Sequence, residues 1–337
     1  MFWFWTGFFA LVALLLFLDL FVLNKGAKEP TIKSAIWWTV GWVALGLSFS
    51  GIVYMMYEYG WLGARLGSNP LCNTGGDAAV TYVSAYLLEQ ALSVDNLFVI
   101  ALVFKQFRIA KKYQHRILFW GIIGAVFFRL IMLGGGAYLA HRFDWIFYVF
   151  GAYLVFQGGK LLVHDDENPP DVENGLVTRT LRRFVKIVDG QKYDGKFRVL
   201  IDGKRAWTTL LVCLISIELA DIVFALDSIP AVLSVSQETF IMVTSNIFAI
   251  LGLRSLYFVL AGAMDEFKYL KIALAVLLML IGAKMFAHEW IHIGHLASLA
   301  GIAGILAIGI IASVIDSKRE AKAAAAVAPI DPSQPEN

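Results

Sequence analysis

The chain has 337 residues and a formal net charge of +2; 59% of its residues are hydrophobic and 16% are charged. A soluble domain is about 45–50% apolar and about 25% charged, so this composition excludes an ordinary soluble enzyme and predicts an all-α integral membrane protein. The small net charge gives no sign of nucleic-acid binding. Two cysteines far apart predict neither a disulfide framework nor a zinc centre.

Membrane-spanning helices need about 20 apolar residues each, and nine segments of the chain meet this requirement. In chain order they are residues 2–23, 35–56, 78–104, 117–140, 145–163, 208–235, 239–262, 270–287 and 296–316. The first segment has no basic start and no small-residue cleavage site, so we interpret it as a retained span.

The segments outside the spans are short, with one exception. Residues 164–207 form a polar loop whose second half alternates and contains Asp-Gly pairs at 194–195 and 202–203, which predicts a β-hairpin. The low-complexity tail is predicted to be disordered. The domain organisation is therefore two spans and an outer loop (1–77), a three-helix unit (78–163), a cytoplasmic loop (164–207), a second three-helix unit (208–287), a last span (288–316) and the tail (317–337).

The positive charges are distributed unevenly among the loops. Of the 28 Lys and Arg residues, 22 lie in alternate loops and the tail, whereas the intervening loops carry only Arg65 and Arg142. Positive charge stays on the cytoplasmic side. The sequence therefore predicts a multi-pass protein of the inner (cytoplasmic) membrane, with its N-terminus outside and its C-terminus in the cytoplasm.

Five carboxylates lie inside segments that otherwise have the composition of spans. They are Glu89, Asp95, Glu218, Asp221 and Asp227. A charged residue at the centre of a membrane helix costs about 2.5–3.5 kcal/mol on insertion scales. Such a residue is a candidate for an ion or proton path.

The two three-helix units resemble one another. Three features recur in the same order in residues 78–163 and 208–287: two acids six residues apart, a mid-span arginine (Arg129, Arg254), and a Gly-Gly-Lys or Gly-Ala-Lys sequence near a span end. A unit of three spans must insert the second time upside down, and inverted repeats with a midplane site are typical of secondary transporters. The alternative is chance similarity between apolar segments.

Helix geometry separates some of the acids. Glu89 and Asp95 are six residues apart and so lie about 120° apart around an ideal helix. Glu218 and Asp221, three residues apart, share a face. Asp227 rejoins them only if its helix breaks.

Polar and helix-breaking residues accompany the acids. Pro230 and the polar Asn96 and Ser228 predict local unwinding, which in transporters exposes carbonyl groups to cations. Carboxylates, hydroxyls and amides such as Asn246 are hard oxygen ligands that suit Mg²⁺, Ca²⁺ or Mn²⁺ rather than Cu or Zn.

The charges of the acids and arginines do not balance. Five ionised acids against Arg129 and Arg254 leave a deficit of three charges, most of which a divalent cation would offset. The alternative is that the arginines pair with two acids while the others are protonated and only pack helices. Glu218 fits that alternative best, because it has no counterpart in the first unit.

One soluble-enzyme motif is present. Residues 288–292, HEWIH, match the zinc-protease pattern H-E-x-x-H, with Glu289 as the base. The motif falls in a short loop at the predicted outer mouth without a third ligand. We interpret it as a chance match or an accessory outer metal contact, and we expect no enzymatic activity.

Several segments resemble one known family. ELADIVFALDSIPAV followed by TSNIFAILGLRSLYF resembles the TerC (tellurium-resistance protein C) family, and LLEQALSVDNLFV with FDWIFYVFGAYLVFQGGKLL is most similar to its pH-responsive Alx branch. The resemblance covers about residues 5–315. It implies a metal-ion transporter related to LysE-type exporters, with Mn²⁺ leaving the cytoplasm. The motif residues of the family map onto Glu89, Asp95, Asn96, Glu218, Asp221, Asp227 and Ser228.

Two functions follow as expectations. The first is export of Mn²⁺ through a midplane site of these residues, supported by Arg129, Arg254 and Asn246. Protonation of the acids offers a means of coupling to H⁺, and the expected partners are the metal ion and the lipid bilayer, with no tightly bound cofactor. The second is a membrane-stress or metal-sensing scaffold whose loop 164–207 recruits partners.

Overall fold

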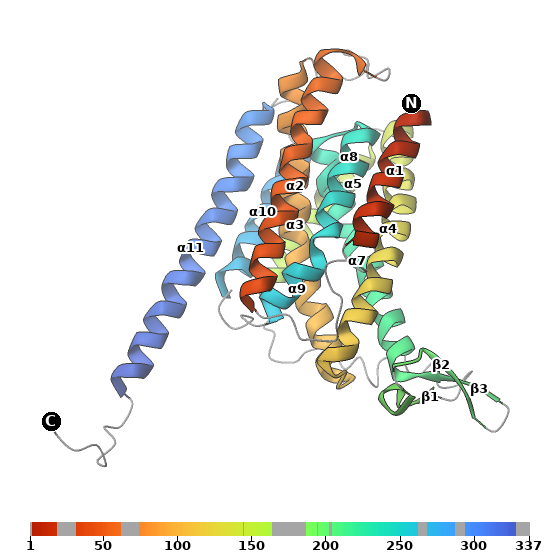
Figure 1. Ribbon diagram of the computed structural model, residues 1–337. Coiled ribbons are helices and arrows are strands. Elements are labelled where there is room, and N and C mark those ends of the chain that lie inside the picture. Colours follow the sequence, from red (N-terminus) through yellow and green to blue (C-terminus); the bar gives the residue numbers. More distant parts are fainter. Residues whose placement is uncertain are drawn as a thin grey trace.

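A computed structural model describes residues 2–18, 32–61, 74–143, 145–163, 187–193, 195–201, 204–261, 268–286 and 294–327. Its described helices are α1 (Phe2–Phe17), α2 (Ile32–Glu58), α3 (Gly75–Gln106), α4 (Lys111–Arg142), α5 (Ile146–Val163), α7 (Thr209–Val235), α8 (Thr239–Leu251), α9 (Leu253–Ala261), α10 (Lys268–Phe286) and α11 (His295–Val327). They form a bundle that has a small β-sheet at one end, called the sheet end below (Figure 1).

Six of the described helices are long and apolar enough to cross a membrane: α2, α3, α4, α5, α7 and α11. The pair α8 and α9 makes a seventh candidate when it is counted as one span. The predicted all-α membrane fold is confirmed, while the exact count of nine spans stays a prediction. In Figure 1, the start of α1 and the end of α11 lie at opposite ends of the bundle.

Helix α3 is held at its start by a capping box. Thr74 Oγ1 accepts a hydrogen bond from the Asp77 backbone N–H, and the Asp77 carboxylate accepts one from the Thr74 N–H. Glu58, the last residue of α2, accepts a hydrogen bond from Gly75 N at 2.9 Å. From this anchored start α3 runs through the bundle, packing against α2, α7, α8 and α11.

The predicted helix break lies elsewhere. Helix α7 continues through Pro230, and α3 is continuous past Asn96, so the expected unwinding beside the acids is wrong for both helices. The interruption falls instead at Gly252, inside the predicted span 239–262, where α8 and α9 meet at a bend of 45°. Glycine destabilises a helix interior by about 1 kcal/mol, so Gly252 is the weak position in that span.

Helix α11 is longer than predicted. It has 33 residues and ends at Val327, so the predicted disordered tail 317–337 is wrong for its first part; residues 328–337 lie outside the described chain. Alanine-rich sequence has high helix propensity, which explains the extension. The helix packs on α10 and α3, and the Ser313 hydroxyl accepts from Tyr269 N at 3.0 Å.

The sheet consists of β1 (Ile187–Val188), β2 (Arg198–Ile201) and β3 (Lys204–Thr208), in the order β1-β3-β2. Strands β2 and β3 are antiparallel with Ile201 opposite Lys204, which confirms the predicted hairpin around 202–203. Strand β1 pairs parallel to β3 and was not predicted. Strand β3 leads directly into α7, so the sheet is fixed to the bundle.

Helices α5 and α10 approach each other closely through small residues. A Cβ added to Gly151 would lie 3.0 Å from the Gly282 carbonyl oxygen, and one added to Gly158 would lie 2.7 Å from the Ala275 carbonyl oxygen. Small residues let membrane helices pack backbone to backbone. Helices α5 and α10, the third helices of the two predicted units, are therefore in direct contact.

Candidate functional site

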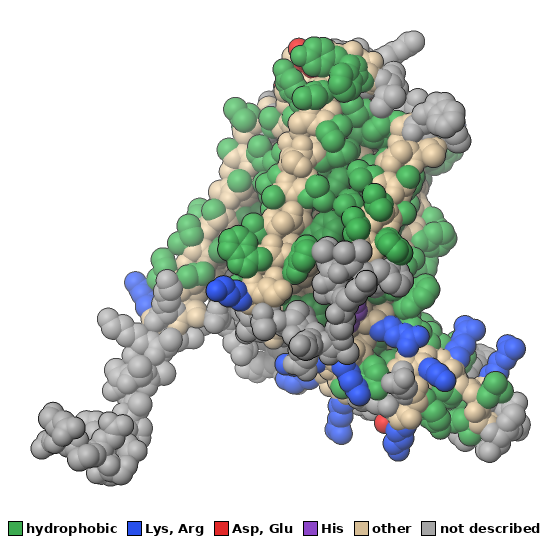
Figure 2. Space-filling view, viewed as in Figure 1, with side chains coloured by type: hydrophobic (Ala, Val, Ile, Leu, Met, Phe, Trp, Pro, Cys, Tyr) green, Lys and Arg blue, Asp and Glu red, His purple; other side chains and the backbone are tan. Residues whose placement is uncertain are grey.

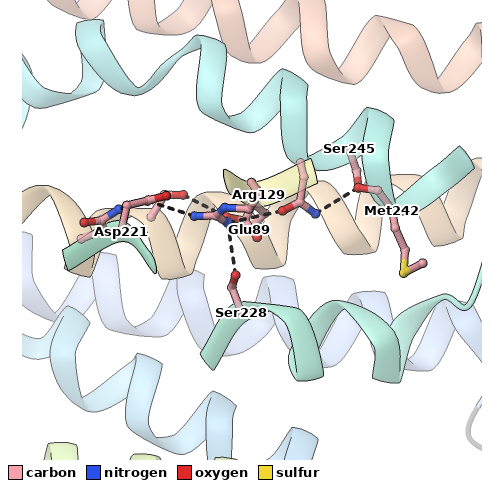
Figure 3. A network of polar contacts seen from close by, with 9 residues as sticks. Glu89, Arg129, Asp221, Ser228, Met242 and Ser245 are labelled. Atoms are coloured by element: carbon pink, nitrogen blue, oxygen red, sulfur yellow. Dashed lines mark hydrogen bonds and ion pairs between the residues drawn. The ribbon is translucent and has the colours of Figure 1, made fainter. Parts of the chain in front are cut away.

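A buried arginine joins the two sets of acids. Arg129 on α4 donates from Nη1 to Glu89 Oε1 on α3, and from Nη2 to Asp221 Oδ1 on α7 at 3.3 Å. Nη1 also lies 3.1 Å from Ser228 Oγ on α7 and 3.3 Å from Asn246 Oδ1 on α8. All five side chains are buried. One guanidinium thus connects four helices (Figure 3).

The hydrogen-bonding groups of this network are only partly satisfied. Nη1 of Arg129 has two hydrogens but faces three acceptors, whereas its Nε has no acceptor among the described residues. Three buried oxygen atoms, Glu89 Oε2, Asn96 Oδ1 and Asp221 Oδ2, likewise have no donor in the described part of the chain. Buried polar atoms almost always have partners. Acceptors without donors are what a cation would complete.

Two cavities adjoin the network and share one residue. The first, called the Asp227 cavity, is lined by apolar side chains and by Glu89, Ser93, Asn96, Arg129, Asp227 and Ser228. The second, called the Glu218 cavity, is lined by apolar side chains and by Asn96, Glu218, Asp221 and Arg254. Asn96 Nδ2 donates to Asp221 Oδ1 at 2.7 Å. The contact between Asn96 and Asp221 therefore lies between the two cavities.

Asp227 has partners that sequence reasoning missed. Its Oδ1 accepts from Tyr153 OH at 2.6 Å and from Gln157 Nε2 at 2.8 Å, both on α5. Because α7 is continuous, Asp227 sits about 120° around the helix from Asp221. The sequence could have indicated these partners, because Tyr153 and Gln157 are polar, lie in an apolar span and share a helix face at the spacing i, i+4.

Glu218 rests against the backbone of α4. It is half-buried and lines the Glu218 cavity together with Asp221, as their spacing predicted. A Cβ added to Gly124 would collide with the Glu218 carboxylate. Gly124 is therefore required for the position of Glu218, and nothing in the sequence pattern indicated this.

Gly124→Ala is expected to push the Glu218 carboxylate off α4 and to lower the melting temperature, because overpacking a tight contact costs about 1–3 kcal/mol. Adding Glu218→Asp, one methylene shorter, is expected to restore much of the loss. Thermal unfolding of the purified protein measures both. Gly134→Ala, on the same helix with nothing within 4 Å of the added Cβ, is the control. Equal melting temperatures for the two alanine variants would contradict the packing of Glu218 on Gly124.

The remaining predicted residues fall into two groups. Arg254 is buried and lines the Glu218 cavity, and its Nη1 lies 2.8 Å from Nε2 of His115. Asp95 belongs to α3, but its side chain lies outside the described structure, as do residues 288–292 with the HEWIH motif.

The four acids whose side chains the structure describes do not form one cluster. Among the described side chains, no three of His, Cys, Asp and Glu lie close enough together to hold a metal ion. Glu89 and Asp221 share Arg129, while Glu218 and Asp227 face separate cavities. The predicted single site of five acids therefore stays a prediction, since the Asp95 side chain lies outside the described structure. Among the four acids with described side chains, Arg129 joins only Glu89 and Asp221.

These features define a multi-pass membrane protein with a buried ionic network between two internal cavities. The chain belongs to the TerC family: residues 74–321 match the integral membrane protein TerC family. An uncharacterized membrane protein of Myxococcus xanthus is 40% identical over 284 residues, covering 83% of this chain and 82% of that protein. A putative membrane-bound redox modulator Alx of Escherichia coli is 39% identical over 293 residues, covering 86% and 87%. An uncharacterized membrane protein of Rickettsia felis is 37% identical over 289 residues, covering 86% and 90%. No solved structure matches the chain.

Proposed function

We propose that the protein exports a divalent metal ion, Mn²⁺, from the cytoplasm through a site centred on Glu89 and Asp221. The observation that carries the proposal is the set of three buried oxygen atoms without donors, Glu89 Oε2, Asn96 Oδ1 and Asp221 Oδ2. A positively charged ligand that accepts lone pairs is the kind of partner that such oxygen atoms lack. The protein acts as a transporter and not as an enzyme.

The chemistry of the ligands favours a hard cation. Carboxylate and amide oxygens suit Mn²⁺, Mg²⁺ and Ca²⁺. The resemblance of the motif residues to manganese exporters selects Mn²⁺ among these. Ser228 and Ser93, which line the Asp227 cavity beside Glu89, supply further oxygen atoms along the path. Protonation of the acids after the ion leaves provides the coupling to H⁺.

The charge distribution supports a cytoplasmic sheet end. Lys and Arg side chains gather around the sheet end in Figure 2, while the flank of the bundle is mostly hydrophobic. Positive residues remain on the cytoplasmic side of a bilayer. The orientation is then N-terminus outside and C-terminus in the cytoplasm of the inner membrane. The Glu218 cavity, lined by residues 217–221 of α7 and 118–125 of α4 in the first half of each helix, opens the path on the cytoplasmic side.

Two contacts between α5 and α10 support the inverted repeat. The matched sequences pair Gly158 with Gly282 and, seven residues earlier, Gly151 with Ala275. Gly151 of the first unit lies close to Gly282 of the second. If each residue is replaced by its match in the other unit, this contact becomes the contact of Ala275 with Gly158, which is also close. A two-fold axis that relates inverted units requires this exchange.

Efflux of radioactive Mn²⁺ from cells tests the proposal. Asp221→Asn keeps the shape of the side chain but removes its charge, so efflux is expected to fall to the background of cells without the protein. Asp189→Asn, which changes an exposed acid next to β1, is the control and is expected to retain efflux. Membrane levels of each variant are measured in parallel. Normal efflux by Asp221→Asn would refute the site.

A second candidate follows from the relatives named as redox modulators. In this alternative the polar core only packs helices, and the sheet recruits partners in a membrane-stress response. Deleting the β2–β3 hairpin would then abolish function while Asp221→Asn would leave it intact. The transport proposal expects the reverse.

A further inference from the structure

We propose that Arg129 is a tethered cation: its guanidinium holds the place of the substrate ion between Glu89 and Asp221, and the ion passes only by displacing it. This inference rests on the proposed transport of a divalent ion. It adds the residue that closes the path and that selects the charge of the ion.

The position of Arg129 fits a closed passage. Arg129 lines the Asp227 cavity, and its Nη2 contacts Asp221, which lines the Glu218 cavity. Asn96 lines both cavities and donates to the same oxygen atom of Asp221. The guanidinium and the Asn96 amide therefore both contact Asp221 beside the two cavities, and in the proposed route an ion moving between the cavities takes the place of the guanidinium.

The hydrogen bonding of Arg129 differs from that expected of a purely structural arginine. A buried network that only rigidifies a protein is expected to be fully satisfied, because each unpaired buried group is costly. Here Nε has no acceptor within the described chain, and Nη1 is shared among three acceptors. Glu89 and Asp221 each accept a hydrogen bond from Arg129 through one carboxylate oxygen atom, and the other oxygen atom of each has no donor within the described chain. Those two remaining oxygen atoms give an entering cation its first contacts before it displaces the guanidinium.

Charge explains why a divalent ion displaces the arginine. With Arg129 in place, ionised Glu89 and Asp221 carry a net charge of −1. A monovalent ion that replaced the guanidinium would leave that charge unchanged and would lose its hydrogen bonds. A divalent ion neutralises the pair fully, while the displaced guanidinium keeps its charge and turns to Asp227, which lines the same cavity; uncompensated charge is expensive in a buried site. Arg129 therefore makes the site selective for doubly charged ions.

The test measures Mn²⁺ binding to purified full-length protein by equilibrium dialysis. If Arg129 holds the ion's place about nine-tenths of the time, its removal raises the apparent affinity about tenfold. Arg129→Gln is therefore expected to bind Mn²⁺ about tenfold more tightly than wild type, to melt at a lower temperature in chelator and to recover on addition of Mn²⁺. Its efflux is expected to fall, because nothing displaces the bound ion. Arg142→Gln, at the exposed end of α4, is the control with unchanged binding.

Arg129→Lys is the second variant, since it keeps the charge but lacks the fork that reaches both acids. Its affinity is expected to lie between those of wild type and Arg129→Gln. Equal or weaker binding by both variants would overturn the tethered cation, and so would loss of fold in Arg129→Gln that Mn²⁺ does not restore. Absence of binding by the wild type would instead refute the transport proposal itself, and the tethered cation with it.

Discussion

Replacing Glu89 by leucine is expected to lower the free energy of unfolding by about 1–3 kcal/mol, because the buried Arg129 guanidinium loses one of its two acid partners. Glu89 is fully buried and accepts from Arg129, which then keeps only Asp221 as an ionic partner among the described residues. The loss is measured by denaturant unfolding of the purified protein, followed by tryptophan fluorescence.

The triple variant Glu89→Leu, Arg129→Met and Asp221→Leu distinguishes charge from packing, because it removes all three ionic members of the network. Replacing every member of a buried ionic network by apolar residues is often nearly neutral for stability. The triple variant is therefore expected to be more stable than Glu89→Leu alone, yet inactive in efflux. If the three substitutions simply added, the ionic network would contribute nothing beyond the volume of its side chains.

Gly158→Leu is expected to destabilise the protein by about 3 kcal/mol, at the upper range of overpacking costs. Its Cβ would lie 2.7 Å from both the Ala275 carbonyl oxygen and Met279 Cγ, and the carbonyl is backbone that cannot move aside without shifting α10. Gly159→Leu is the matched control, because a Cβ there meets nothing within 4 Å and leucine favours helix over glycine. Thermal unfolding of the two variants gives the comparison. A smaller loss for Gly158→Leu than for Gly159→Leu would contradict the close approach of α5 and α10.

The membrane helices were predictable because a bilayer imposes one simple requirement, a run of apolar residues of sufficient length. The same requirement made the buried acids conspicuous, so Glu89 and Asp221 stood out without any structure. Helix periodicity also placed Glu218 and Asp221 on one face, and both line the Glu218 cavity.

Contacts between helices were not predictable from periodicity, which orders residues around one axis and says nothing about neighbours. The bridging of two acids by Arg129 and the partnership of Asp227 with Tyr153 are of this kind. Proline misled the prediction for a related reason. A proline removes one hydrogen bond of a helix, but α7 stays helical through Pro230 within its packed surroundings. The bend occurs in another span, at Gly252 between α8 and α9.

The length of α11 has a practical consequence. At 1.5 Å per residue its 33 residues extend about 50 Å, whereas the hydrocarbon layer is about 30 Å thick. In Figure 1 the helix leans away from the bundle towards its C-terminal end. The helix is therefore about 20 Å longer than one crossing of the hydrocarbon layer requires, so its last turns are available outside that layer. A fluorescent reporter attached to the C-terminal end of α11 would report on the protein at a distance from the ionic network.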